Sequence, residues 1–510
     1  MALCNHPQRI VIEQIFVNEN ADSASLAAMN QVREVPDPAL SAQGGGDQPP
    51  VPFRTGNSAV STRGSNKLAP AFLGRGLGVL TTALAAALLP RLLPQQEFGQ
   101  FSLVVTYVLF TGCLAQMGLG GAIIRCLVEA LVASDGRRLR RILAVNFRML
   151  AVSSLGVSLL SAAALCWQGP ALWKLDVSWS LAVIVFVLVL LTAWQQFLAE
   201  CLRGLHASGM ASLFSGGQFG GSVSTLVLFT LLGAAMTLAA PPTALQALPL
   251  LALGLLATVV ISGWTLRTVA KRTLSHLAPG AGNITASELL QLSLPILIWQ
   301  TLTLATLYAD VFIAGQAFPL EELATYQVAR RWCALLSLPM QLVMFAVAPS
   351  IPDLYARGEL DRLQKRLRMA TTLAALPGMM AGLILVFAPG WILRISGAAY
   401  DTPQAGRLLA ILSLGQITMA FTGIAGYTLT LTGKHLAALA INASVSVLVV
   451  SLGWFAAHRF GGVGLAITFA AGAGFQSLIE WLVVRRLLGF WTHADFVTSP
   501  QSLWREIWGG

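Results

Sequence analysis

The sequence predicts an all-α polytopic membrane protein of about twelve transmembrane helices, arranged as two six-helix lobes around a central cavity. Three observations predict it. Of the 510 residues, 55% are hydrophobic and only 11% are charged, with a mean hydropathy of +0.70. Apolar runs about as long as a bilayer-spanning helix recur along most of the chain. The second half of the chain also repeats features of the first. A soluble enzyme of this length would need far more charged side chains to cover its surface, and a nucleic-acid-binding protein would carry its basic residues in one domain.

Residues 1–67 differ from the rest of the chain. They are rich in proline and glycine, carry charges of both signs and lack a sustained apolar segment, so we expect a disordered cytoplasmic tail. They also lack the apolar core of a cleaved signal peptide. The first membrane segment is therefore expected to serve as the insertion signal.

From residue 68 onward the apolar runs follow one another with polar gaps between them. The twelve predicted spans are 72–93, 98–122, 140–166, 178–202, 209–237, 244–266, 291–316, 323–350, 367–394, 405–431, 436–457 and 462–487. An even number of spans places both termini on the same side of the membrane. A short cytoplasmic tail, 489–510, is expected to follow the last span.

Lysine and arginine residues are distributed unequally between alternate gaps. Fifteen lie on one side: Arg125, Arg137, Arg138, Arg140, Arg141, Arg203, Arg267, Lys271, Arg272, Arg357, Arg362, Lys365, Arg366, Arg368 and Lys434. Five lie on the other: Arg91, Lys174, Arg394, Arg407 and Arg459. The positive-inside rule places the first set, and both termini, in the cytoplasm. The expected location is the cytoplasmic (inner) membrane.

An internal repeat divides the membrane region into two halves. Residues 94–101 read PQQEFGQF and residues 319–326 read PLEELATY, an offset of 225 residues from Pro94 to Pro319. The same offset relates Arg75 to Gln300 and Gln116 to Gln341. We therefore predict an N-terminal lobe at 68–288 and a C-terminal lobe at 289–488. Two lobes of six helices have the same orientation and would be related by an axis along the membrane normal.

Ionisable residues within the predicted spans are candidates for pairing or function, because they are costly in a bilayer. Arg75 and Asp310 could each serve structure or the cavity between the lobes. Arg330 and Arg331 are neighbours about 100° apart on a helix, so at most one should point straight into that cavity. Glu200 and Glu480 lie near span ends, where pairing with Arg203 and Arg485 or contact with water is expected. Arg148 is expected to extend to the headgroups.

Neutral polar and sulfur-containing residues give weaker indications. Gln300 and the other glutamines in the spans, Gln195, Gln196, Gln341 and Gln416, could line a hydrated path or form hydrogen bonds between helices, and the second is the simpler interpretation. The six cysteines lack a C-x-x-C pair, so neither a disulfide framework nor a metal site is expected. Glycine-rich fragments lie inside spans without a preceding strand, which disfavours nucleotide binding.

Several of these segments resemble bacterial oligosaccharide flippases, the polysaccharide-biosynthesis (O-antigen-type) transporters of the MATE-like MOP exporter superfamily. The similarity is carried by five segments: residues 93–102, the QMGLGG at 116–121, Leu294 and Pro295 leading to Asp310, the ELATYQVAR at 322–330, and the APSIPDLY at 348–355. It covers about residues 68–488. The long amino-terminal tail departs from the family, as does Ala324, which stands where a glycine is expected.

The resemblance implies a transporter and no enzyme: export of a polyprenyl-diphosphate-linked oligosaccharide to the periplasmic leaflet by alternating access. Its partners would be membrane lipids, the lipid-linked oligosaccharide and polysaccharide-assembly proteins. No cofactor is implied beyond coupling to H⁺ or Na⁺. Arginine suits a diphosphate, so Arg75, Arg330 and Arg331, with Gln300, are the candidate substrate-binding residues. Asp310 is the candidate for ion pairing or coupling.

Two alternatives share part of this sequence pattern. A MATE-like, cation-coupled exporter of small organic molecules would have the same architecture, but the charged candidates are basic by three to one and would repel an organic cation. A membrane glycan polymerase or ligase would need a large external loop, and every predicted external gap is short. The flippase is therefore the favoured interpretation.

Overall fold

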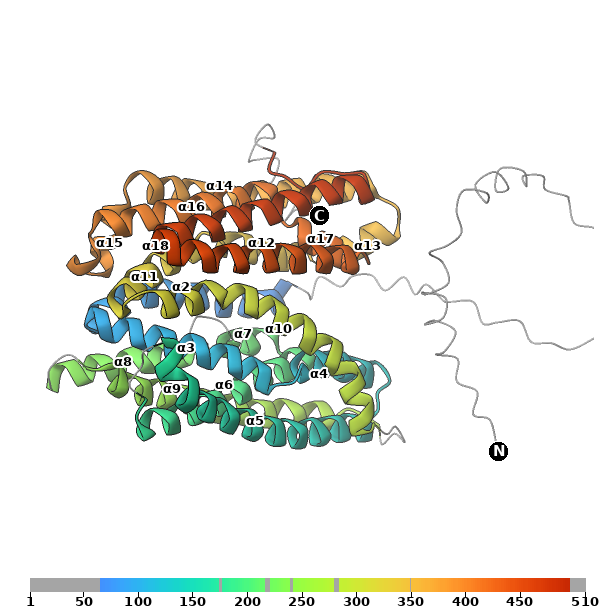
Figure 1. The fold of residues 1–510 in the computed structure, drawn as a ribbon. Helices are drawn as coiled ribbons and strands as arrows, with labels where there is room; N and C mark the ends of the chain where they lie inside the picture. The colour runs from blue at the N-terminus through green and yellow to red at the C-terminus, as the bar shows by residue number, and fades with distance from the viewer. Residues whose placement is uncertain are drawn as a thin grey trace, which may run out of the picture. The chain divides into compact units, whose positions relative to one another are not determined.

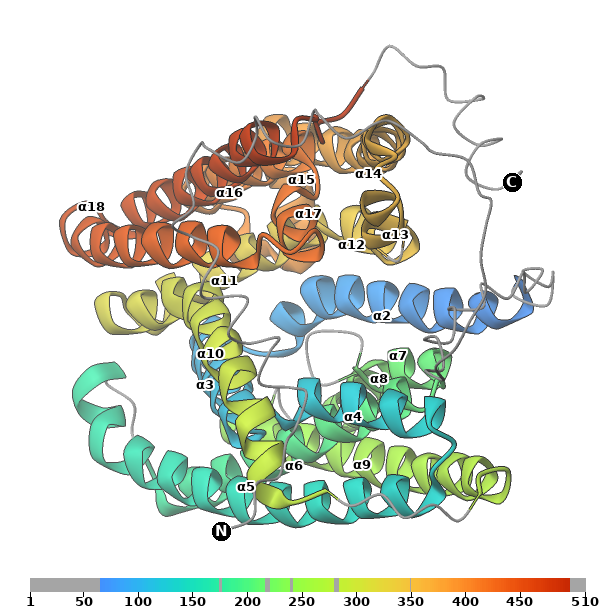
Figure 2. The ribbon, with the colours of Figure 1, turned by 90° about the vertical axis from the view of Figure 1, so that its right-hand side faces the viewer.

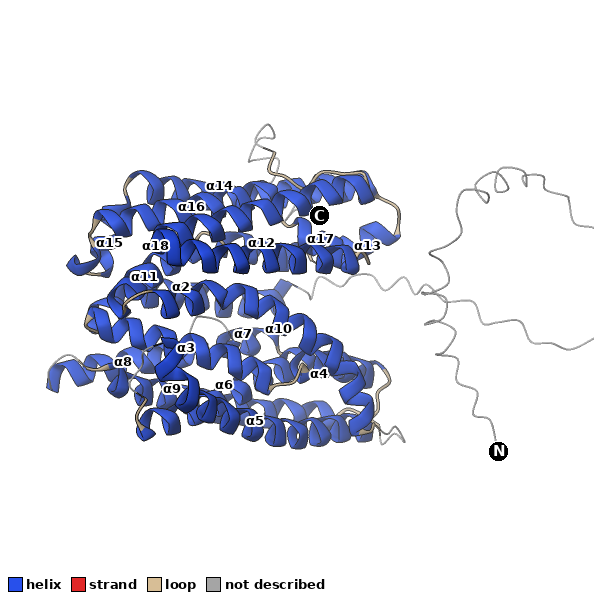
Figure 3. Cartoon of the chain, viewed as in Figure 1, coloured by secondary structure: helices blue, strands red, loops and turns tan. Residues whose placement is uncertain are grey.

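The structure, a computed structural model, describes residues 65–173, 177–215, 221–238, 242–278, 284–348 and 350–495. These residues belong to one compact unit. Within them the regular secondary structure is helical apart from one isolated bridge between Asp135 and Ala278, as Figure 3 shows. The predicted tail at 1–67 lies outside the described residues except for its last three, which begin the first described helix.

The first half of the chain contains eight of the described helices (Figure 1). They are α2 (Ser65–Leu92), α3 (Gln95–Ala115), α4 (Leu119–Val132), α5 (Gly136–Trp173), α6 (Trp179–Gly204), α7 (Ser208–Ser215), α8 (Ser222–Leu238) and α9 (Ala244–Ser275).

The second half contains the remaining described helices. They are α10 (Ala286–Ala317), α11 (Leu320–Leu335), α12 (Leu338–Val347), α13 (Ser350–Ala356), α14 (Leu360–Phe387), α15 (Pro389–Ser396), the 3₁₀ turn η2 (Ala398–Tyr400), α16 (Pro403–Thr422), α17 (Ala425–Leu431) and α18 (His435–Leu488).

Within the described residues each predicted span falls on one or two helices, and eight of the described helices are long and apolar enough to cross a membrane. Five spans are divided between two helices: α3 and α4, α7 and α8, α11 and α12, α14 and α15, and α16 and α17. The last two predicted spans are the two arms of α18, which meet at Gly461. The predicted all-α polytopic fold is confirmed.

Local backbone geometry accounts for where these helices begin and divide. Thr285 starts α10, because its side chain accepts a hydrogen bond from the Glu288 amide and the Glu288 carboxylate accepts one from the Thr285 amide. Between α3 and α4, Gly118 has φ 72°, a left-handed conformation that glycine adopts without steric cost. Gly461 has φ 65° and ψ −157° and turns α18 back on itself.

The first helix of each half lies at the boundary between the halves, as Figure 2 shows for α2 and α10. Helix α2 packs on α7 and α8 of its own half and on α11 and α15 of the other, while α10 packs on α18 and also on α3 and α4. We call the side where α2, α5 and α14 begin the basic side, because Arg137 and Arg362 lie there at the starts of α5 and α14. The opposite side is the far side.

The apolar core is continuous on the far side and divided on the basic side. One buried cluster joins Phe98 and Phe101 of the first half to Tyr326 and Tyr400 of the second. Nearer the basic side there are two clusters, one built mainly by α4, α5 and α6 and the other by α14, α17 and the ends of α18. The two halves are therefore sealed together on the far side, and a space can open between them on the basic side.

Candidate functional site

A cavity of about 620 Å³ lies between the two halves. Its walls come from α2, the end of α3, α4, the last turns of α6 and α7 in the first half, and from α10 and α12 in the second. The lining residues are Gly78, Val79, Thr82, Cys113, Gln116, Gly120, Gly121, Ile124, Gln196, Glu200, Arg203, Ser212, Ser215, Gln300, Leu338, Gln341 and Leu342. Because α6 ends and α7 begins on the basic side, the cavity occupies that half of the molecule.

Four glutamines give the cavity an uncharged polar lining. Gln116 and Gln196 come from the first half, and Gln300 and Gln341 come from the second. The Gln116 amide donates to the Gln196 carbonyl oxygen, and the Gln341 amide donates to Ser337 Oγ at 3.1 Å. Each side-chain amide carries both donors and acceptors. Such a lining suits a ligand rich in hydroxyl groups.

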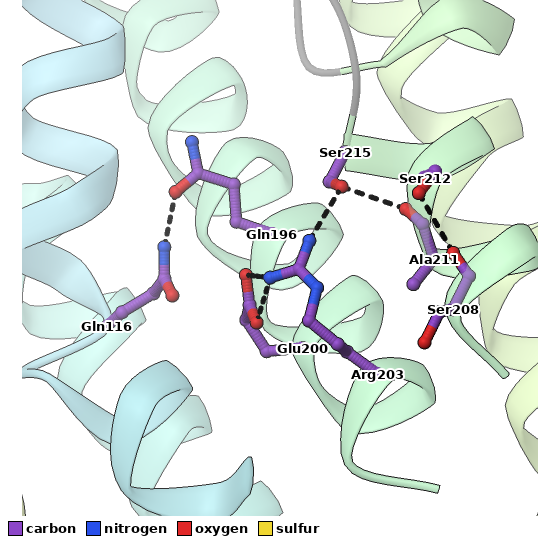
Figure 4. A network of polar contacts seen from close by, with 8 residues as sticks. All are labelled: Gln116, Gln196, Glu200, Arg203, Ser208, Ala211, Ser212 and Ser215. Atoms are coloured by element: carbon purple, nitrogen blue, oxygen red, sulfur yellow. Dashed lines mark hydrogen bonds and ion pairs between the residues drawn. The ribbon is translucent and has the colours of Figure 1, made fainter. Parts of the chain in front are cut away.

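The charged groups of the lining form one ion pair, Glu200 and Arg203, which Figure 4 shows in detail. Arg203 Nη1 donates to both carboxylate oxygens of Glu200, and Nη2 donates to Ser215 Oγ at 3.2 Å. Ser215 in turn donates to the Ala211 carbonyl oxygen at 2.8 Å. The two charged side chains are 23% and 34% exposed respectively, so cavity water or a ligand can reach them.

The predicted pairing of Glu200 with Arg203 is confirmed. For Glu480 the expectation was pairing with Arg485 or contact with water, and the pairing is wrong. Glu480 accepts a hydrogen bond from Gln476 Nε2 at 3.0 Å, whereas the Arg485 guanidinium lies over the Trp491 ring at 5.1 Å. The cause is the segment that follows α18, which folds back and offers Arg485 an aromatic face.

Two of the sequence-predicted site residues belong to helices that line the cavity. Gln300 is itself a lining residue. Arg75 lies on α2. The lining residues Gly78, Val79 and Thr82 follow it at spacings of three, four and seven residues, so its backbone position is on the same face of the helix. The Arg75 side chain lies outside the described part of the structure.

The other three predicted residues lie away from this cavity. Arg330 Nε donates to Asp310 Oδ2 at 2.6 Å, and the Tyr326 hydroxyl donates to the same oxygen at 3.1 Å. The neighbouring Arg331 points across to the first half, where its Nη2 donates to Ser102 Oγ at 3.1 Å. The two adjacent arginines therefore face different surroundings, as helical geometry requires.

The duplicated segments, 94–101 and 319–326, pack against each other at the far-side junction. A Cβ atom on Gly99 would lie 2.1 Å from the Leu320 carbonyl oxygen, so only glycine permits this approach. Gln95 Nε2 donates to the Glu321 carbonyl oxygen at 3.1 Å and to Thr325 Oγ1 at 3.0 Å. We call the contact of these two segments the far-side seam.

Sequence reasoning did not single out Arg203 or the serines of α7 as candidate site residues. The only feature in the sequence that pointed to Arg203 was its pairing with Glu200 at the end of a predicted span. Such a pair is also common at an ordinary helix terminus. Only the packing of α7 against α2 and α6 shows that this terminus faces a cavity. Among the described residues there is no group of three His, Cys, Asp or Glu side chains that could hold a metal ion.

Comparisons with known proteins place this arrangement in context. The family model described as Polysaccharide biosynthesis protein matches residues 71–354, and the MatE family model matches residues 295–455. A comparison with curated proteins returned no match.

Solved structures of MOP-superfamily transporters share the fold. An inward-facing multidrug resistance MATE family transporter has a TM-score of 0.61 at 14% identity, covering 83% of this chain and 97% of the other. The lipid II flippase MurJ in an inward closed conformation has a TM-score of 0.60 at 13% identity, covering 87% and 90%. An outward-facing multidrug resistance MATE family transporter has a TM-score of 0.53 at 17% identity, covering 83% and 95%.

Proposed function

The chain belongs to the polysaccharide biosynthesis protein family, within the MOP superfamily of membrane transporters, and on that premise we propose that it is a flippase for a polyprenyl-diphosphate-linked oligosaccharide. It would move this lipid from the cytoplasmic to the periplasmic leaflet by alternating access. The observation that carries the proposal is the amide-lined cavity between the halves, on the side where the core is divided.

The chemistry of the cavity lining supports a glycan as cargo. Sugar hydroxyls leaving water need partners that both donate and accept hydrogen bonds, and the four glutamines supply both. Gln300 would be one of these sugar contacts. Because the amides are uncharged, they would bind sugars without holding them too tightly to release.

The diphosphate would be bound by arginine. A guanidinium presents a planar fork of donors and keeps its charge when partly desolvated. Arg203 lies in the cavity wall, and Arg75 is on the face of α2 that lines the cavity. The polyprenyl tail would stay in the bilayer while its head group enters between the halves.

The basic side would face the cytoplasm, because the positive-inside rule places the arginine-rich gaps there. The cavity would then be loaded from the cytoplasmic leaflet. Opening of the far-side seam would expose Arg331 and the Asp310–Arg330 pair, so that these residues meet the head group as it leaves. Coupling to H⁺ or Na⁺ would bias this step, with Asp310 holding Arg330 in place.

A MATE-like exporter of organic cations is the alternative that shares this fold. An organic cation needs an unpaired carboxylate, and the one carboxylate among the described lining residues, that of Glu200, is neutralised by Arg203. The cavity therefore favours the lipid-linked glycan.

Reconstitution into liposomes tests the proposal. A fluorescent polyprenyl-diphosphate oligosaccharide should exchange between leaflets with the wild-type protein, and the double variant Gln116→Leu/Gln341→Leu should slow the exchange by about tenfold or more, since each lost hydrogen bond to a sugar costs about 1 kcal/mol. The matched control is Gln416→Leu, since Gln416 lies on α16 and is not a lining residue.

Imposed H⁺ and Na⁺ gradients across the liposome membrane would identify the coupling ion. Absence of exchange in wild type, with transport of an organic cation instead, would contradict the proposal.

A further inference from the structure

The cavity contains an arginine that already has an anionic partner. Arg203 Nη1 is held by both carboxylate oxygens of Glu200, and Nη2 is held by Ser215. Glu200 and Arg203 are three residues apart on α6, so the pair is local and forms without any contribution from the second half. Figure 4 shows that the guanidinium lies between Glu200 on one side and Ser215 on the other.

These groups form part of a continuous polar stripe on the cavity face of α6. Gln196, Glu200 and Arg203 follow one another at spacings of four and three residues, which is one face of a helix, and all three line the cavity. Gly120 of α4 leaves room for the side chains of Gln116 and Glu200, since a Cβ atom there would lie 2.8 Å from Gln116 Oε1 and 3.3 Å from Glu200 Cγ.

A guanidinium cannot serve this carboxylate and a diphosphate equally at the same time. Both anions draw on the N–H donors of one guanidinium, and the negative charges of Glu200 and the diphosphate would repel each other at such short range. The diphosphate carries more charge and more acceptor oxygens than a single carboxylate, so it is the stronger partner for Arg203.

We propose that Glu200 is an internal substitute for the substrate's diphosphate: it occupies Arg203 while the cavity is empty and is displaced when the lipid-linked diphosphate binds. This inference rests on the proposed function. It assigns the anion-binding position of the cavity to Arg203 and Ser215, and it gives Glu200 the role of a competitor.

The exchange of partners has a consequence for the transport cycle. An empty carrier must close its cavity to return, and closing over an unpaired guanidinium would bury an uncompensated charge. With Glu200 in place the empty cavity holds a neutral pair. The empty carrier can therefore close, whereas an empty carrier that lacks Glu200 would close over an unpaired guanidinium and should return slowly.

The test measures binding of farnesyl diphosphate, a soluble polyprenyl diphosphate, to the purified full chain in detergent by calorimetry. Glu200→Gln keeps the shape of the side chain but removes its charge, so the dissociation constant should fall by about tenfold or more, as expected for a charge-assisted competitor. Arg203→Gln should raise it by about tenfold or more, and Glu200→Gln/Arg203→Gln should behave as Arg203→Gln does.

A second ion pair of the same kind supplies the control. Arg125 and Glu129 form an exposed pair on α4 that is outside the cavity lining, so Glu129→Gln should leave binding unchanged. In liposomes Glu200→Gln should also slow repeated leaflet exchange, although it binds the probe more tightly, because the empty carrier returns slowly.

The outcomes separate this inference from the proposed function. Equal or weaker binding of farnesyl diphosphate by Glu200→Gln, with a melting temperature like that of wild type, would overturn the role of Glu200. If wild type fails to exchange the lipid-linked glycan while Glu200→Gln still tightens farnesyl diphosphate binding, the proposed function fails and the anion-binding position stands.

Discussion

Gly99 allows the far-side seam to close, and adding a single methyl group there should open it. In the structure a Cβ atom at this position would lie 2.1 Å from the Leu320 carbonyl oxygen, where ordinary contact begins at 3.4 Å. The two segments would therefore have to separate by about 1.3 Å, the difference of those distances. Overpacking of this kind costs about 1–3 kcal/mol. In the proposed cycle the cost falls only on conformations with a closed seam, so Gly99→Ala should shift the equilibrium about 5- to 150-fold toward an open seam.

The population with an open seam can be measured by labelling a buried thiol. Ser102 is 1% exposed and lies beside the seam, so a cysteine introduced there reacts with a membrane-impermeant maleimide only while the seam is open. The background carries Cys4→Ser, Cys113→Ser and Cys166→Ser, because Cys113 lines the cavity and Cys166 is exposed. When opening is fast relative to labelling, the rate is proportional to the open population. Gly99→Ala should therefore raise the labelling rate by about 5- to 150-fold.

Gly156→Ala is the matched control for this substitution. Gly156 also lies within a helix, but a Cβ atom there would meet nothing within 4 Å. Both variants gain the same helix propensity, so only the clash at Gly99 differs between them. Equal labelling rates in Gly99→Ala and Gly156→Ala, in proteins that melt alike, would refute the role of the seam as a gate.

Three further predictions concern stability. Asp310 is 7% exposed and Arg330 is 22% exposed, so Asp310→Asn should lower the melting temperature in detergent more than the double variant Asp310→Asn/Arg330→Gln does. The single change leaves the partly buried Arg330 without its carboxylate, and breaking a fully buried pair costs about 3–5 kcal/mol. Equal stability of the two variants would count against a structural pair. Gly461→Ala should destabilise the protein by about 1–3 kcal/mol, since its φ and ψ suit only glycine, and an unchanged melting temperature would contradict this. Burial, and secondly Arg368, lowers the pKa of His493 in the segment after α18. The folded protein therefore binds a proton less readily than the unfolded chain there, so the stability from His493 is present above its ordinary pKa of about 6.5 and is lost as pH falls. We therefore compare the melting temperatures of wild type and His493→Gln as the pH is lowered from 8 to 5. The melting temperature of wild type should fall relative to that of the variant, and a relative rise would contradict the predicted direction.

The sequence by itself determined the membrane character, the positions of the helices and the duplication of the chain. Spans can be located in the sequence because a segment that crosses lipid must be apolar and satisfy its backbone hydrogen bonds internally, and within the described residues each predicted span falls on helix. The repeat pointed to the segments at 94–101 and 319–326 as special, although it did not show that they would meet. Divided helices were not foreseen, because a break such as the one at Gly118 needs only one left-handed residue inside an apolar run.

The tertiary structure decided which polar residues share a cavity. Sequence placed Arg330 and Arg331 among the substrate-binding candidates, but the packing of α11 joins Arg330 to Asp310 and Arg331 to Ser102. The tertiary structure also places the ion pair of Glu200 and Arg203 in the cavity wall, whereas in the sequence this pair resembles an ordinary helix end. The physical reason is that helical periodicity fixes the face of a helix on which a side chain lies, whereas the surroundings of that face depend on how helices distant in sequence pack together.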